Sequence, residues 1–164
     1  MPQNPRVLLI ADLNYHAKGH SRLQALKRLG LETRSISHTP ITVASHGEPK
    51  PTLAFRIAWK LGFHLDTEDV NKQLLRDSLD FEPDIIWIEK GNMIKPTTLS
   101  DLRKQFTRAV IASYSEDDMF NPVNRTIAYV RGLRHYHIVF ITKSYNANPS
   151  ELPSLGAHVC QFVD

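Results

Sequence analysis

Three consecutive acidic residues, Glu116, Asp117 and Asp118, stand in the stretch SYSEDDMFNPVNR that spans residues 113–125. A carboxylate that is partly desolvated beside another carboxylate has its pKa raised toward neutrality, which suits a general base. The apolar run at 109–112 predicts a buried strand just before them. The acids then lie at a strand's carboxyl end, where open α/β sheets bind ligands. We therefore predict that this loop forms one wall of the functional site.

A purely structural role for the same loop stays open. Aspartate and asparagine are common in turns that precede helices, and the side chains of adjacent residues point apart. Asn121-Pro122 would supply the N-cap and the first-position proline of a following helix. Glu116 and Asp118 also resemble a D-x-D-like metal motif, but a metal site needs further ligands from elsewhere, and we expect none.

Charged and titratable side chains follow two other predicted strands. Glu89 and Lys90 leave the most hydrophobic strand of the chain, where ionised groups are costly unless they are paired or bind a ligand. His16 and His20 lie in the loop after the first strand. Either could act as a base near neutral pH, because an unperturbed histidine titrates at about 6.5. Solvated loop histidines are the plain alternative.

Several familiar sites are excluded by their missing motifs. The sequence contains no G-x-G-x-x-G, no P-loop, no H-E-x-x-H and no G-x-S-x-G. Cys160 is the only cysteine, so an intrachain disulfide and a cysteine-based metal site are both impossible. Asp12 after the first strand, the acid after another strand and Lys143 after a later one resemble a phospho-receiver domain. The length of the chain and the irregular loop at 38–51 count against that reading.

Composition indicates a soluble globular protein. The 164 residues are 41% hydrophobic and 23% charged, and no apolar run reaches the roughly 20 residues that span a bilayer. We therefore expect a cytoplasmic protein with no transmembrane segment. The net charge of +3 is mildly basic, but no basic stripe interleaved with aromatic residues occurs, so we expect no nucleic-acid partner.

The chain alternates between apolar runs and segments of helical spacing. The runs predict strands at 6–11, 31–37, 84–89, 109–114, 137–142 and 158–163. The alternation predicts an α/β fold, specifically a Rossmann-like, doubly wound, mostly parallel sheet of five to six strands with helices on both faces. We expect residues 1–164 to form this single domain. Right-handed crossovers would place every strand-to-helix loop on one edge of the sheet.

Several segments, in this order, resemble the amino-terminal half of CgeB-like (spore maturation protein-like) glycosyltransferases of the two-domain GT-B architecture. The matching pieces are RVLLIADLN with LQALKRLGLE, FEPDIIWIEKG with PTTLSDLR, YSEDDMFNPVNR, YHIVFITKSYN and LGAHVCQFVD. They cover nearly the whole chain, and residues 38–66 are the least diagnostic part.

The resemblance implies the acceptor-side domain of a hexosyltransferase that is inactive alone. Its partners would be a sugar or glycan acceptor and a nucleotide-sugar, the latter held by a carboxy-terminal domain that this sequence lacks. The nucleotide-sugar would be a substrate, with no cofactor. Asp118 or Asp117, and then His16, would be the catalytic base. The expected substrate-binding residues are Asn14, His20, Glu89, Lys90, Glu116, Asn124, Arg125 and Lys143.

Two readings from other classes remain. One is a non-catalytic binding or interaction domain that holds a sugar or a nucleotide in the same cleft. The other is a phospho-receiver-like signalling domain. If acetyl phosphate and beryllofluoride fail to perturb the domain, the receiver reading is wrong.

Overall fold

The computed structural model describes residues 4–40 and 52–163. Within them the chain forms one parallel sheet of six strands in the order β2-β1-β3-β4-β5-β6. The strands are β1 (Arg6–Ala11), β2 (Glu32–Ser37), β3 (Ile85–Glu89), β4 (Val110–Ser115), β5 (Ile138–Ile141) and β6 (Cys160–Phe162). The predicted doubly wound α/β fold is confirmed, and each predicted strand occurs within two residues of its expected bounds.

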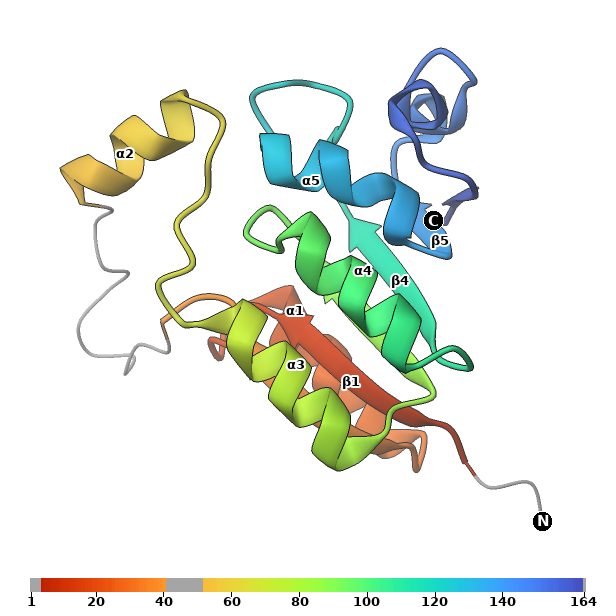
Figure 1. The fold of residues 1–164 in the computed structure, drawn as a ribbon. Helices are drawn as coiled ribbons and strands as arrows, with labels where there is room; N and C mark the ends of the chain where they lie inside the picture. The colour runs from red at the N-terminus through yellow and green to blue at the C-terminus, as the bar shows by residue number, and fades with distance from the viewer. Residues whose placement is uncertain (1–3, 41–51, 164) are drawn as a thin grey trace.

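Helices cover both faces of the sheet. They are α1 (Lys18–Arg28), α2 (Leu53–Lys60), α3 (Val70–Phe81), α4 (Pro96–Gln105) and α5 (Ile127–Gly132), followed by the 3₁₀ turns η1 (Leu133–His135), η2 (Ser144–Ala147) and η3 (Leu152–Leu155). Figure 1 shows α3, α4 and α5 in front of the sheet, with α1 behind it and α2 standing apart at one side.

The central strand β1 shows why the apolar runs fold as they do. Leu8 and Ile10 belong to the larger core under α3, α4 and α5. Leu9, the residue between them, belongs to the smaller core under α1, where it joins Leu23 and Leu26. Successive strand residues point to opposite faces, so a strand covered on both sides needs apolar residues throughout.

One helix end and one helix start follow from local residues. Gly30 ends α1 with a φ of 74°, a left-handed conformation that glycine adopts without strain. Asp66 caps α3 from outside the helix, because its carboxylate accepts hydrogen bonds from the backbone N–H groups of Val70 at 2.7 Å and Asn71 at 3.0 Å. The carboxylate thereby satisfies N–H groups that have no partner inside the helix.

The expected cap at Asn121-Pro122 is wrong. Asn121-Pro122 forms a turn, and α5 begins later, where the Thr126 hydroxyl accepts a hydrogen bond from the Tyr129 N–H at 3.1 Å. Helix α4 begins at Pro96, and Thr98 is buried inside it. The predicted loop at 38–51 has no regular structure at 38–40, and its remainder lies outside the described residues.

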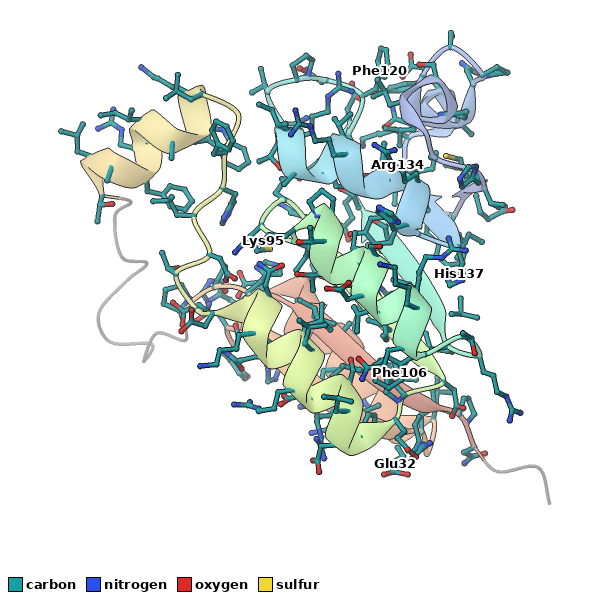
Figure 2. All side chains as sticks on the ribbon, viewed as in Figure 1. Glu32, Lys95, Phe106, Phe120, Arg134 and His137 are labelled. Atoms are coloured by element: carbon teal, nitrogen blue, oxygen red, sulfur yellow. The ribbon has the colours of Figure 1, made fainter. Side chains whose placement is uncertain are left out.

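The sheet topology fixes where a ligand can bind. Strand β1 pairs with β2 on one side and β3 on the other, so the connections leave in opposite directions at the β1/β3 pair. Figure 2 shows Glu32 and Phe106 at the end of the molecule opposite Phe120, which follows β4. In such sheets the crevice outside the carboxyl ends of the two switch-point strands is the ligand site. Among the described helices, none is long and apolar enough to cross a membrane.

Candidate functional site

A cleft of about 820 Å³ opens at the β1/β3 switch point. Its walls come from the β1–α1 loop, the end of β2, helix α2 and the loops after β3 and β4. Asp12 follows β1 and Glu89 ends β3, so each switch-point strand delivers a carboxylate to the cleft. The predicted wall after β4 is present, since Glu116 and Asp117 both line the cleft.

Asp12 is held by hydrogen bonds from its own loop and from the end of β2. Its Oδ1 accepts from the Asn14 backbone N–H at 3.0 Å, the Asn14 side-chain amide at 2.8 Å and the Thr39 hydroxyl at 2.7 Å. Burial raises the pKa of Asp12, but the hydrogen bonds from Asn14 and Thr39 outweigh it and lower the pKa overall. Asp12 is therefore a fixed carboxylate that orders the floor of the cleft.

Arg22 is the central cation of the site. It donates to Glu89 Oε1 at 2.9 Å and to the Tyr114 hydroxyl at 3.1 Å, and it also forms an ion pair with Glu116. Its guanidinium lies 4.4 Å from the centre of the Tyr114 ring. Burial raises the pKa of Glu89, although the charge of Arg22 opposes the shift. Arg22 thus neutralises two carboxylates that enter from different strands.

Two lysines pair with the acids after β4. Lys18 pairs with Glu116. Burial acts to raise the pKa of Glu116, but its bonds to Lys18 and Arg22 lower that pKa overall. Lys90 Nζ lies 2.9 Å from Asp117 Oδ2. Lys90 adopts a left-handed φ of 58°, a conformation that costs a residue with a side chain about 1–2 kcal/mol and is commonest at functional sites.

Helix α2 forms an aromatic and cationic wall of the cleft. His64 packs edge-on against Phe55 and Trp59, with ring centroids 4.9 Å and 5.5 Å apart. Arg56 and Lys60 line the same cleft. The salt bridges at the cleft use Lys18, Arg22 and Lys90, so Arg56 and Lys60 have no carboxylate partner in the described part of the chain.

His38 follows β2 and lines the cleft beside Asp12. Its Nδ1 is buried and has no hydrogen-bond partner among the residues that the structure describes. Burial lowers the pKa of His38 to about 4, against the opposing charge of Asp12. The imidazole is therefore neutral near physiological pH.

The structure brings together about half of the predicted site residues. Those that line the cleft are His16, Glu89, Lys90, Glu116, Asp117 and Asn124. Those outside its lining are Asn14, His20, Asp118, Arg125 and Lys143.

Asp118, the first candidate for a base, instead holds its own loop together. Its Oδ1 accepts hydrogen bonds from the Phe120 N–H at 3.1 Å and from the Asn146 amide at 2.9 Å. These bonds lower the pKa of Asp118 overall, although burial acts to raise it. Arg125 stacks on the neighbouring Phe120 ring at 5.1 Å.

The other predicted residues outside the lining are placed as follows. Asn14 is buried, and its side-chain amide donates hydrogen bonds to Asp12 and to the Pro40 carbonyl, the latter at 3.1 Å. His20 packs against the Tyr15 ring at 5.7 Å. Lys143 precedes the 3₁₀ turn η2 after β5.

Sequence reasoning missed Arg22, His38 and the α2 wall. Arg22 lies four residues after Lys18, so helical spacing places both on one face of α1. The same spacing relates Phe55 to Trp59 and Arg56 to Lys60, so the two pairs form two adjacent stripes of α2. Those stripes were the signal available in the sequence. His38 carries none, because it lies in a segment without a period.

Comparison with known proteins yields matches only among solved structures. No family model matches the chain. No curated protein matches either. RcsB from Salmonella enterica serovar Typhimurium, solved bound to promoter rprA in the presence of phosphomimetic BeF3⁻, matches with 10% identity and a TM-score of 0.46 over 92% of this chain and 58% of that one.

A LuxR-family two-component response regulator from Aurantimonas sp. SI85-9A1 matches with 12% identity and a TM-score of 0.40, over 97% of this chain and 90% of that one. The chain therefore spans a little over half the length of the RcsB chain and most of the Aurantimonas one.

These findings correct the resemblance to CgeB-like GT-B glycosyltransferases, which is wrong. The two solved structures described above are response regulators, not glycosyltransferases. The expected glycan acceptor and nucleotide-sugar partner are wrong for the same reason, and the expectation of no nucleic-acid partner falls with them.

Proposed function

We propose that this chain is a receiver-like signalling domain that recognises a phosphate-bearing ligand in the cleft at the β1/β3 switch point. The observation that carries the proposal is the charge of that cleft. Five cationic side chains line it, and its four carboxylates already have partners within the protein. The cations are Lys18, Arg22, Arg56, Lys60 and Lys90.

The unpaired cations supply the attraction. Arg56 and Lys60 project from one helix into the cleft without a carboxylate partner in the described part of the chain. A phosphate group accepts charge-assisted hydrogen bonds from guanidinium and ammonium groups, and these are among the strongest polar contacts available. The cleft can therefore gain an anion without first breaking an internal ion pair.

The start of α1 adds to this attraction. Ala17 caps the helix with no side-chain hydrogen bond, and the first turn contains no acidic residue. Free backbone N–H groups and the positive end of the helix dipole favour an anion at such a terminus. Gly19 allows this turn to lie close against the end of β1, because a Cβ at this position would lie 2.4 Å from the Asp12 carbonyl oxygen.

A covalent variant of the proposal rests on Asp117. Its side chain is 42% exposed, which makes it the most open of the paired carboxylates at the cleft, and Lys90 lies beside it. One Asp117 oxygen would attack the phosphorus of a donor such as acetyl phosphate, and acetate would leave with the electron pair of the bond that breaks. Lys90 would neutralise charge on the phosphoryl oxygens.

The test is a titration of the isotopically labelled chain with inorganic phosphate, beryllofluoride and acetyl phosphate, followed by NMR. We expect amide shifts in the first turn of α1, in α2 and at residues 89–91. The double variant Arg56→Gln/Lys60→Gln should weaken phosphate binding by about tenfold or more. Lys72→Gln, an exposed lysine on α3, is the matched control.

Two results would decide between the variants of the proposal. A mass gain of one phosphoryl group after acetyl phosphate, lost in Asp117→Asn, would establish the covalent form. If none of the three compounds shifts the cleft amides, the proposed function is wrong. A cytoplasmic location and the lack of a cofactor stay predictions that belong to this proposal.

A further inference from the structure

We infer that the phosphate-bearing ligand is a nucleotide whose base packs on the aromatic wall of α2. The inference rests on the proposed function, because it names the rest of the ligand whose phosphate the cations hold. The aromatic wall is formed by Phe55 and Trp59 of α2 and by His64, which follows the helix, and all three line the cleft.

The size of the cleft requires more than a phosphate. Its volume of about 820 Å³ falls within the range of roughly 300–1,000 Å³ that small-molecule and cofactor sites occupy. A phosphate ion held by Arg56 and Lys60 would leave most of this space to water. A ligand that fills the cleft therefore has a body larger than its charged group.

The aromatic wall selects a flat, apolar-faced body. His64 lies edge-on to Phe55 and Trp59, with interplanar angles of 85° and 77°. Phe55 and Trp59 line the cleft and are half-buried among the described residues, so part of each is open to a ligand there. Nucleobases stack on such side chains whatever their identity, because every base presents a π-face.

The order of residues along α2 matches the two ends of a nucleotide. Phe55 and Trp59 form one stripe of the helix, and Arg56 and Lys60 form the adjacent one. A base on the first stripe therefore lies next to cations on the second. A phosphosugar would use only the cationic stripe, and a nucleoside only the aromatic one.

Intrinsic fluorescence and calorimetry with AMP, UMP, ribose 5-phosphate, adenosine and inorganic phosphate test the inference on the whole chain. Trp87 is the second tryptophan, so the Trp87→Phe variant isolates the emission of Trp59. We expect AMP to quench Trp59 and to bind about tenfold or more tightly than ribose 5-phosphate. UMP should retain part of this gain.

Trp59→Leu should reduce AMP affinity to that of ribose 5-phosphate and leave phosphate affinity unchanged. Trp59→Phe keeps an aromatic face, and it should keep most of the gain even if the leucine variant disturbs α2. Equal affinities for AMP and ribose 5-phosphate would overturn the nucleotide inference and leave the proposed function standing. Binding of adenosine as tight as that of AMP, or no binding by any phosphate compound, would overturn both.

Discussion

Arg22 and Glu89 form an ion pair with 2.9 Å between Nη1 and Oε1, although 67 residues separate them in the chain. The pair joins the first turns of α1 to the last residue of β3. It therefore bridges the two sides of the topological switch point. Glu89 is buried, so its charge depends on this partner.

Arg22→Met should destabilise the domain by about 2–4 kcal/mol near neutral pH, because it leaves the Glu89 carboxylate buried without its cation. Burial raises the pKa of Glu89 in the folded state. The folded state therefore binds more protons than the unfolded one at pH values just above the ordinary glutamate pKa, and stability falls as pH rises through that window. Acidification should accordingly return part of the lost stability. Urea unfolding at several pH values measures both effects.

The double variant Arg22→Met/Glu89→Gln serves as the control for this prediction. It removes the stranded charge together with its partner, so it should be more stable than Arg22→Met alone. A double variant as unstable as the single one would show that Arg22 acts through packing on Tyr114 rather than through Glu89.

His38 should make the stability of the domain depend on pH with the opposite sign. Its pKa is lowered to about 4, so between about 6.5 and 4 the unfolded state binds a proton that the folded state does not. Stability is then complete above the ordinary histidine pKa and declines as pH falls through this window, on the order of 1–3 kcal/mol in all. The difference between wild type and His38→Asn in urea unfolding isolates this slope. Parallel curves for the two proteins would contradict the prediction.

The sheet could be predicted from the sequence because each strand is a local apolar run. RVLLIA predicts β1 over residues 6–11, and the structure has the same bounds. The start of α5 could not be predicted in the same way. Asn121-Pro122 is a good local cap, but Asn92 accepts the Thr126 N–H at 3.0 Å and its own carbonyl accepts the Thr126 hydroxyl at 2.7 Å, so a tertiary contact sets the start at Thr126.

The candidate site was predictable only as an edge of the sheet. Glu89 and the acids after β4 could be placed at this edge from the sequence. The strand pattern locates the ends of β3 and β4, and right-handed crossovers put those ends on the same edge of the sheet. No local pattern states which cation meets which acid. Arg22 pairs with Glu89 rather than with an acid that is closer in the sequence. This follows from the packing of α1 on β1, which is a property of the assembled core.

Two substitutions of Lys90 separate the effect of backbone strain from the effect of the side-chain charge. Lys90→Ala and Lys90→Gly both remove the ion pair with Asp117, but only glycine adopts the observed φ of 58° without strain. The glycine variant should be the more stable of the two by about 1 kcal/mol. Both should lose phosphate affinity to the same extent. If alanine proves as stable as glycine in thermal unfolding, the left-handed turn after β3 is not maintained in solution.

Gly19→Ala should separate α1 from the end of β1. The new Cβ would lie 2.4 Å from the Asp12 carbonyl oxygen and 2.6 Å from the Ala11 Cβ, and both are fixed by the strand. Overpacking of this kind costs about 1–3 kcal/mol, and it should also weaken phosphate binding because the first turn of α1 forms part of the cleft. Gly132→Ala in α5 is the matched control, since its Cβ would meet only the end of the Leu99 side chain, at 3.0 Å. Unfolding free energies and phosphate titrations of the two variants test the argument, and a Gly19→Ala protein that matches Gly132→Ala in both would show that the close approach of α1 to β1 has no part in the site.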